Sequence, residues 1–339
     1  MVGLKIGVDL GTSMFRAYAE GAGEIFSEPS IISIEEESGT ISSVGKAAYD
    51  MLYKSPDVYN VVKPLESGGI SNYDAAQLML NTFFDKLFKN KVFKPTIAAC
   101  MPAGITALEE RALLKLYFSA GAGRVCLLEQ PLAAAIGAGV ILDKPFGTMV
   151  VDIGAGTADI AVVTMGSTAV SRSVKIGGDF LDKSIIDYLR INRSVIIGKK
   201  TAEQLKFQLA GAVKRSEEIA AVSKGKSTDD GMPVYFEVTT SEINLAIKQA
   251  LEDICKAILS VLETTPPELL KDITENGIIL SGSASQLFGL DLLITEYTSI
   301  KSIVIDDPAN AVVKGLRKAL KNTEYLKEQG YRFKTMEDI

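Results

Sequence analysis

Apolar and polar residues alternate along the chain with two periods, one typical of strands and one typical of helices. Two pairs of short runs rich in β-branched residues, at residues 4–18 and 149–163, are each interrupted by a glycine-containing turn and predict two β-hairpins. Further strands are expected at residues 24–34, 40–44, 96–101, 124–128 and 234–238, within 277–285, and before Ile176. Helices are expected at residues 46–54, 74–89, 132–139, 179–190, 201–211 and 242–263. The mixture predicts an α/β protein.

Several element boundaries carry their own chemical signals. Thr106 followed by Glu109 has the spacing of a capping box and predicts a helix start. Pro131 and Pro308 are well placed at the beginnings of two further helices. Residues 314–334 are rich in charge and are interpreted as a tail that is mostly solvated helix, and residues 224–231 as an exposed loop.

The turns of the two hairpins share one plan. In each, an Asp ends the first strand and a Gly–Thr turn follows, at Asp9 and at Asp152. Backbone N–H groups in such a turn can form an anion-binding nest, and an adjacent carboxylate can hold hydrated Mg²⁺. An ordinary hairpin with a glycine-rich turn explains either copy alone. Two copies suggest two similar subdomains that face one phosphate chain.

Composition narrows the possible chemistry. The 339 residues, 47% hydrophobic and 23% charged, favour two or three domains. The formal net charge is −6 and no run of Lys and Arg is present, so we expect no nucleic-acid partner. The three cysteines are widely spaced in apolar segments, which is typical of buried thiols in a reducing compartment. Histidine is absent, which excludes a Ser-His-Asp triad, a His base and His-ligated zinc.

The chain also lacks signals for export or membrane insertion. Strand pattern begins at Leu4, which leaves no room for a signal peptide, and no uninterrupted apolar stretch is long enough to span a bilayer. We therefore expect a cytoplasmic protein.

Motifs spread over the chain resemble those of the actin-like ATPases, most closely the bacterial MreB family. They follow the family's order from residue 4 to about residue 320 and comprise Asp9-Leu-Gly-Thr, Glu129-Gln-Pro-Leu-Ala-Ala-Ala-Ile-Gly, Asp152-Ile-Gly-Ala-Gly-Thr, Gly177-Gly-Asp, Thr201-Ala-Glu-Gln-Leu-Lys, Thr265-Pro-Pro-Glu-Leu and Gly277-Ile-Ile-Leu-Ser-Gly. This order makes the resemblance far more specific than any one motif.

The resemblance implies an actin-like ATPase fold. Two lobes, each with a mixed five-stranded sheet related by a ribonuclease H-like duplication, would close over ATP or ADP with Mg²⁺, and two smaller subdomains would complete the molecule. Subdomain IA would comprise residues 1–32, 65–143 and 311–339, IB residues 33–64, IIA residues 144–180 and 246–310, and IIB residues 181–245.

The resemblance also assigns roles to individual residues. Asp9 and Asp152 would hold Mg²⁺ through its waters, and Gln130 and Thr157 would orient the attacking water, because phosphoryl transfer depends on charge neutralisation and alignment. The nucleotide would be bound by Gly11, Thr12, Ser13, Met14 and Arg16 in the first loop, by Gly154, Ala155, Gly156 and Thr157 in the second, and by Glu203, Lys206, Gly282 and Ser283 around the nucleoside. Without the family, Glu203 and Lys206 would pass as a solvated helix face.

Four departures from the usual MreB pattern bear on these roles. Gln130 stands where Glu is usual, as it does in actin, and an amide can orient water but cannot take its proton. Met14 and Arg16 also resemble actin, and Arg16 either reaches the β-phosphate or is a surface residue of the outgoing strand. Ala155 replaces a glycine of the second loop, and Ser283 with the following Ala replaces two more. We expect slower or differently gated hydrolysis.

A short loop resembles the membrane-contact loop of MreB proteins. Val92 and Phe93 lie between a predicted helix and strand and are flanked by three lysines. Two apolar side chains beside positive charge would attach weakly to the inner face of the cell membrane, and strongly only through many copies in a filament. The alternative is that Phe93 packs on its own helix.

The sequence thus predicts an ATP-binding, MreB-like protein that forms head-to-tail filaments, hydrolyses ATP slowly and supports cell shape or a related cytoskeletal task, with other shape-determining proteins as further partners. Three alternatives remain. A pseudo-ATPase filament subunit would bind ATP and barely cleave it. A small-molecule kinase of the same superfamily would need an Asp base that is not evident here, and a nucleotide-dependent chaperone would need a substrate-binding domain.

Overall fold

Two five-stranded sheets form the centres of two lobes in the computed structural model, which describes all residues except 1–3, 36–39, 52–58, 89–93 and 142–143. The sheet of lobe I has the order β10-β9-β1-β2-β3, and its strands are β1 (Lys5–Leu10), β2 (Met14–Ala19), β3 (Phe26–Pro29), β9 (Thr96–Met101) and β10 (Arg124–Glu129). The sheet of lobe II has the order β13-β12-β11-β17-β18, and its strands are β11 (Thr148–Ile153), β12 (Ala158–Thr164), β13 (Ser167–Val174), β17 (Ile278–Ser281) and β18 (Ser302–Val304).

The two sheets repeat one topology. In each, the first strand pairs antiparallel with the second and parallel with a later strand, β1 with β2 and β9, and β11 with β12 and β17. Both predicted hairpins are therefore confirmed as the centres of their sheets. The predicted fold of two mixed five-stranded sheets is also confirmed.

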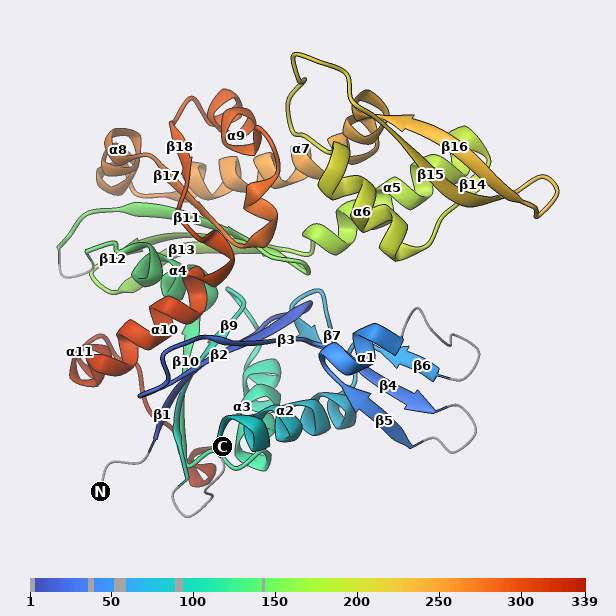
Figure 1. Cartoon of the computed structure of the whole chain (residues 1–339). Coiled ribbons are helices and arrows are strands. Elements are labelled where there is room, and N and C mark those ends of the chain that lie inside the picture. The colour runs from blue at the N-terminus through green and yellow to red at the C-terminus, as the bar shows by residue number, and fades with distance from the viewer. Residues whose placement is uncertain (1–3, 36–39, 52–58, 89–93, 142–143) are drawn as a thin grey trace.

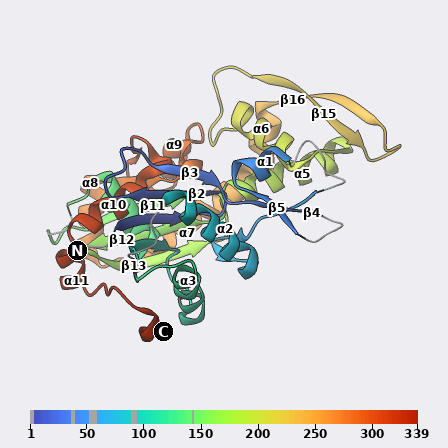
Figure 2. The same ribbon diagram turned by 60° about the horizontal axis from the view of Figure 1, so that its bottom comes forward.

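A smaller sheet extends each lobe. In lobe I, β4 (Ile32–Glu35), β5 (Ile41–Val44) and β6 (Tyr59–Val62) form the sheet beside α1 (Lys46–Met51), and β7 (Leu65–Glu66) and β8 (Gly69–Ile70) form a tight turn next to it. In lobe II, β14 (Val195–Ile196), β15 (Ala220–Ser227) and β16 (Pro233–Thr239) form a sheet beside α5 (Gly178–Arg193) and α6 (Lys199–Leu209). Figure 2 shows the β15–β16 hairpin reaching away from the rest of the molecule.

The remaining helices cover the large sheets. They are α2 (Tyr73–Leu87), α3 (Ala107–Ser119), α4 (Gln130–Ala138), α7 (Thr240–Thr264), α8 (Pro267–Asn276), α9 (Leu290–Thr298), α10 (Ala311–Lys321) and α11 (Thr323–Glu328). The predicted capping box at Thr106 and Glu109 is present at the start of α3. Pro308 begins a short 3-10 turn that precedes α10.

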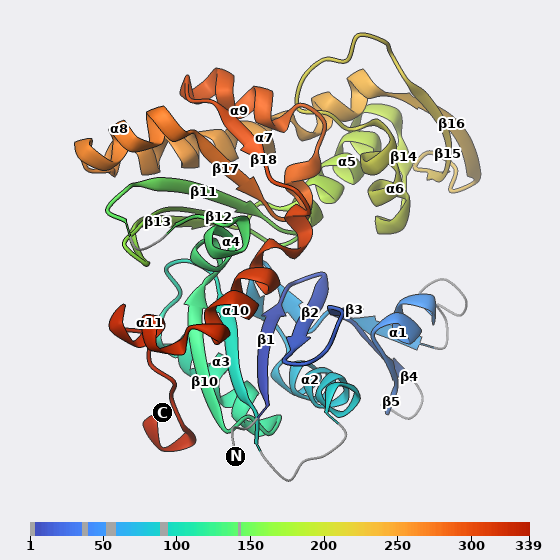
Figure 3. The ribbon, with the colours of Figure 1, turned by 60° about the vertical axis from the view of Figure 1, so that its left-hand side comes forward.

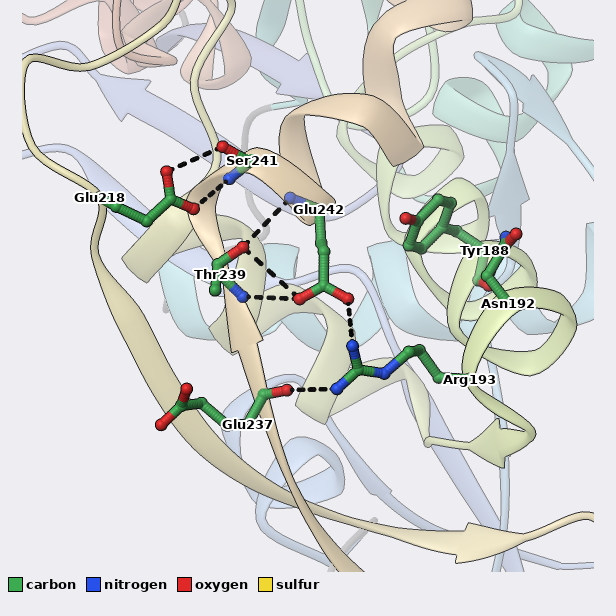
Figure 4. Close-up of polar contacts among 8 residues, drawn as sticks. All are labelled: Tyr188, Asn192, Arg193, Glu218, Glu237, Thr239, Ser241 and Glu242. Atoms are coloured by element: carbon green, nitrogen blue, oxygen red, sulfur yellow. Dashed lines mark hydrogen bonds and ion pairs between the residues drawn. The ribbon is translucent and has the colours of Figure 1, made fainter.

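Polar contacts tie the small sheet of lobe II to α7 (Figure 4). Glu242 caps α7 by accepting from the Thr239 N–H at 3.1 Å and also pairs with Arg193 Nη1 at 2.7 Å. Arg193 Nη2 donates to the Glu237 carbonyl at 2.9 Å, and Glu218 accepts from both the backbone and hydroxyl of Ser241. The ends of α5, β16 and α7 therefore hold one another in place.

An apolar cluster joins the lobes at α4 and α10 (Figure 3). It takes residues from both sheets and both helices, among them Ala98, Leu132, Val150, Ala161 and Leu316. The two helices cross with their backbones in contact, because a Cβ built on Gly315 would lie 1.7 Å from the Ala133 carbonyl oxygen. This crossing, called the hinge below, packs the two lobes against each other.

Two predictions about exposed segments are right only in part. The charged tail is largely helical, but α10 is not solvated on all sides, because it buries Leu316, Ala319 and Leu320 at the hinge. Residues 224–231 are not a loop throughout, because Lys224 to Ser227 form the end of β15, paired with both β14 and β16. The two short helices α8 and α9 also lie where no helix was predicted.

Candidate functional site

A cleft of about 1850 Å³ lies between the lobes, with one large hairpin on each wall. It is large enough for a phosphorylated nucleoside of ordinary size. Every predicted phosphate, nucleoside, water-orienting and metal residue lines it: Asp9, Gly11, Thr12, Ser13, Met14, Arg16, Gln130, Asp152, Gly154, Ala155, Gly156, Thr157, Glu203, Lys206, Gly282 and Ser283. Residues far apart in the sequence are therefore brought to one cavity.

The first hairpin carries a carboxylate with a nearby cation. Asp9, at the end of β1, is buried, and its Oδ2 lies 3.9 Å from Arg16 Nη1 on β2. Cys100 Sγ donates to Asp9 Oδ1 at 3.3 Å. Burial raises the pKa of Asp9, and the Arg16 guanidinium partly offsets this effect. Arg16 thus faces the carboxylate inside the cleft, and the reading of Arg16 as a surface side chain is wrong.

The second hairpin carries a carboxylate with neutral partners. Asp152 is 1% exposed, and its Oδ2 accepts from Gln130 Nε2 at 2.6 Å while its Oδ1 accepts from Ser281 Oγ at 2.6 Å. Burial raises its pKa to about 7, although the Ser281 and Gln130 hydrogen bonds lower it and the Asp159 and Asp9 charges raise it. Without a cation, this carboxylate is poised to hold a proton near neutral pH.

Thr157 is held by a residue that sequence reasoning missed. Its hydroxyl donates to Asp159 Oδ2 at 2.7 Å, and Asp159 Oδ1 accepts from the Ala103 N–H at 3.1 Å. Asp159 is completely buried, and burial raises its pKa. Because the Thr157 proton is directed toward Asp159, the hydroxyl lone pairs are left free to accept a hydrogen bond from water in the cleft.

The two hairpins approach each other closely beside the β7–β8 turn. A Cβ built on Gly156 would lie 2.4 Å from Thr12 Oγ1 and 2.9 Å from the Gly68 nitrogen. The Gly68 N–H donates to Thr12 Oγ1 at 3.2 Å. Only a residue without a side chain allows this approach of the two hairpins.

The predicted nucleoside residues lie on α6 and after β17. Lys206 pairs with Asp182 Oδ1 at 2.8 Å and donates to the Gly178 carbonyl at 3.0 Å, so its ammonium group is bound to α5. Burial raises the pKa of Asp182 to about 6, against the effect of Lys206. Glu203 lies on the same helix, and Gly282 and Ser283 form the turn at the end of β17.

Four further cleft or wall residues were not predicted: Cys100, Asp159, Ser281 and Lys63. Asp159 carried a signal, since an acid within a buried strand needs a partner. Ser281 and Cys100 look like ordinary small strand residues, and only the pairing of β11 with β17 and of β1 with β9 places them beside the carboxylates.

The proposed membrane loop residues Val92 and Phe93 lie outside the described residues. Within the part of the chain that the structure describes, no helix combines the length and the apolar character needed to cross a bilayer. The same residues contain no cluster of three or more Cys, Asp or Glu side chains suited to direct metal binding.

Duplicated lobes with an Asp-bearing hairpin on each wall of one cleft define an actin-like protein. Solved structures agree: MreB 5 of Spiroplasma citri bound to AMPPNP superposes with a TM-score of 0.91, at 32% identity, over 97% of this chain and 99% of that chain. The MamK double helical filament gives a TM-score of 0.78 at 21% identity, over 94% and 98%, and supports the fold.

The chain belongs to the MreB/Mbl family, because the MreB/Mbl protein model matches residues 3–328. It is 36% identical over 321 residues to the cell shape-determining protein MreB of Escherichia coli (strain K12), and this match covers 93% of this chain and 92% of the relative. It is also 36% identical over 329 residues to the cell shape-determining protein Mbl of Bacillus subtilis (strain 168), over 96% and 98%.

Proposed function

We propose that this protein binds ATP or ADP with Mg²⁺ in the cleft, assembles head to tail into cytoskeletal filaments, and hydrolyses ATP slowly in support of cell shape. The observation that carries the proposal is the convergence of two Asp-bearing hairpins, one per lobe, on a single cavity. Structures of MreB5 of Spiroplasma citri bound to ADP and to AMPPNP support the nucleotide assignment.

The residues of the cleft fit such a ligand. The close contact of Gly156 with Thr12 brings the two hairpin turns together at the cleft, and N–H groups in such turns favour phosphate oxygens. Asp9 is close enough to Asp152 in the same cleft for its charge to raise the pKa of Asp152. With no cage of three acids in the described residues, two buried carboxylates suit a cation that keeps its waters.

Bound Mg²⁺ would neutralise charge on the phosphates. Gln130 and Thr157 would align the attacking water. Thr157 would accept one hydrogen bond from this water, and Gln130 would accept another through its amide oxygen. Gln130 cannot take a proton, and its Nε2 already donates to Asp152. We therefore propose slow hydrolysis, with a pseudo-ATPase as the alternative that this hydrogen bond favours.

Self-association is the part of the proposal that concerns the exposed apolar side chains of lobe II. The β15–β16 hairpin exposes Val222 and Tyr235, at 71% and 67%, while α9 on the other side of lobe II exposes Leu292, at 58% (Figure 1). Apolar side chains exposed at two separate places on lobe II are compatible with a heterologous contact that repeats without closing. The MamK double helical filament shows that a protein of this fold assembles into filaments.

We further propose the division into subdomains IA, IB, IIA and IIB at the boundaries given above, and a cytoplasmic location peripheral to the inner face of the membrane. Val92 and Phe93 would supply weak contact with lipid and filament formation would multiply it. Liposome co-pelleting decides the matter: a Val92→Ser/Phe93→Ser variant that pellets as well as wild type removes this loop.

Phosphate release measured alongside sedimentation tests the proposal. Wild type, Gln130→Glu and Asp152→Ala are compared with ATP and Mg²⁺. We expect wild type to pellet with ATP and release phosphate slowly, Gln130→Glu to release it faster, and Asp152→Ala to do neither. Pelleting without phosphate release identifies a pseudo-ATPase. A wild type that neither pellets nor releases phosphate, yet phosphorylates a sugar, is a kinase and contradicts the proposal.

A further inference from the structure

An ion pair crosses the cleft from one lobe to the other. Lys63 Nζ lies 2.9 Å from Asp179 Oδ2, and both residues line the cavity. Lys63 follows β6 in lobe I, and Asp179 lies in the first turn of α5 in lobe II. We infer that this pair is a latch that must break when the cleft opens and that slows the release of nucleotide. The inference rests on the proposed nucleotide binding.

Asp179 is attached to the second hairpin. The Gly178 N–H donates to the Gly154 carbonyl at 3.0 Å, and the Asp179 N–H donates to the Ala155 carbonyl at 2.9 Å. A carboxylate in the first turn of a helix is also favoured by the helix dipole. Any movement of the hairpin turn therefore moves Asp179 with it.

Lys63 is attached to the first hairpin. Ser71 Oγ donates to the Lys63 carbonyl at 3.0 Å, which fixes the backbone before the β7–β8 turn. That turn contains Gly68, whose N–H donates to Thr12 Oγ1 in the first hairpin. The ion pair thus connects the two proposed phosphate loops through short, rigid paths.

The position of the pair suits a latch. The lobes share an apolar contact at α4 and α10, the hinge, whereas Lys63 follows β6 of the small sheet of lobe I and Asp179 begins α5 beside the small sheet of lobe II (Figures 1 and 3). A rotation of the lobes about the hinge would separate the two side chains while the hinge stays packed. Another ion pair between α10 and lobe II, Lys314 with Asp307 at 2.6 Å, lies beside the hinge, where the same rotation moves it little.

The strength of the pair sets the size of the expected effect. The side chains of Lys63 and Asp179 are 32% and 40% exposed, so solvent and salt screen their attraction. Partly exposed pairs contribute modestly, and we expect a change of about two- to fivefold in the nucleotide release rate. The effect should shrink as ionic strength rises, since the pair weakens in wild type as well.

Release of a fluorescent ADP analogue, chased with excess ATP, tests the latch. Lys63→Gln and Asp179→Asn should each speed release by about two- to fivefold, and Lys63→Asp combined with Asp179→Lys should restore the slow rate. Lys46→Gln is the matched control: Lys46 also lines the cleft from lobe I but pairs with Asp50 in its own helix. Unchanged release in Lys63→Gln, or equal acceleration in Lys46→Gln, overturns the latch.

A second measurement needs no nucleotide. Nitroxide labels at Ser42→Cys on β5 and Gln208→Cys on α6 report the separation of the small sheets. Labelling is selective for these two positions because the three native cysteines are buried. We expect Lys63→Gln to extend the distance distribution of the empty protein, and the swapped pair to restore it. An unchanged distribution overturns the latch. If wild type binds no nucleotide, the proposed function is wrong. The label distances still show whether the ion pair holds the two lobes together.

Discussion

The two hairpins that face the cleft have the same fold but opposite electrostatic arrangements. Asp9 has a cation of its own hairpin, Arg16, at 3.9 Å, whereas the hydrogen-bond partners of Asp152 among the described residues are the amide of Gln130 and the hydroxyl of Ser281. Both carboxylates are buried, and the pKa of each is raised by burial. Lobe I therefore neutralises its acid internally, while lobe II leaves its acid to be neutralised by a proton or by an added cation.

Closing the two hairpins on each other should be the most sensitive step. Gly156→Ala places a Cβ 2.4 Å from Thr12 Oγ1, and such overpacking should weaken ATP binding by about ten- to a hundredfold. Gly154→Ala is the control in the same turn, because its Cβ would lie 3.8 Å from the nearest atom, the Thr157 oxygen. Titration of a fluorescent ATP analogue measures both variants, and equal affinities would refute the close approach.

The uncompensated acid should make stability depend on pH. Between pH 4 and 7 the folded protein keeps the Asp152 proton while the unfolded chain has lost it, so the free energy of unfolding falls as pH rises. Without nucleotide and Mg²⁺, the free energy of unfolding of wild type should fall by about 2 to 4 kcal/mol across this window, and Asp152→Asn should abolish this fall. Urea unfolding at pH 5 and 8 measures it.

Asp9→Asn is the companion experiment in the other hairpin. Arg16 offsets part of the burial effect on the pKa of Asp9, so this variant should change the pH dependence less than Asp152→Asn does. An equal or larger change in Asp9→Asn would show that the two carboxylates do not differ in the way their partners indicate.

Removing the internal cation should have the smallest effect. Arg16→Met takes positive charge from the first hairpin and should weaken ATP binding by about three- to fivefold, while Arg16→Lys should retain most of the affinity. Isothermal titration at fixed Mg²⁺ gives the two dissociation constants. If Arg16→Met and wild type bind ATP with the same affinity, Arg16 does not contribute to ATP binding and acts only on the charge of Asp9.

The sequence predicted the parts of the fold that have strong local patterns. Both hairpins, the long helix α7 and the capping box at Thr106 follow from alternation, period and caps. No helix was predicted at α8, although Pro267 stands at its first position and proline is favoured there. Lys224 to Ser227 are polar, and only pairing with two neighbouring strands makes them part of a sheet.

The site residues also divide into those with a local sequence pattern, which were predicted, and those placed only by the fold, which were not. Asp9, Asp152 and their turns were identified from the repeated motif, and the cleft does bring them together. Their partners could not be identified, because Cys100, Ser281 and Lys63 reach the site only through strand pairing and lobe contact. Distant residues that meet in the folded chain leave no local pattern in the sequence.

A structure of this protein with a non-hydrolysable ATP analogue and Mg²⁺ tests the central claim most directly. We predict that the terminal phosphates lie between Gly11–Thr12 and Gly154–Thr157, that the cation is held through water by Asp9 and Asp152, and that Gln130 has turned from Asp152 toward the terminal phosphate. A triphosphate that contacts one hairpin alone, or that lies outside the cleft, would contradict the two-hairpin site.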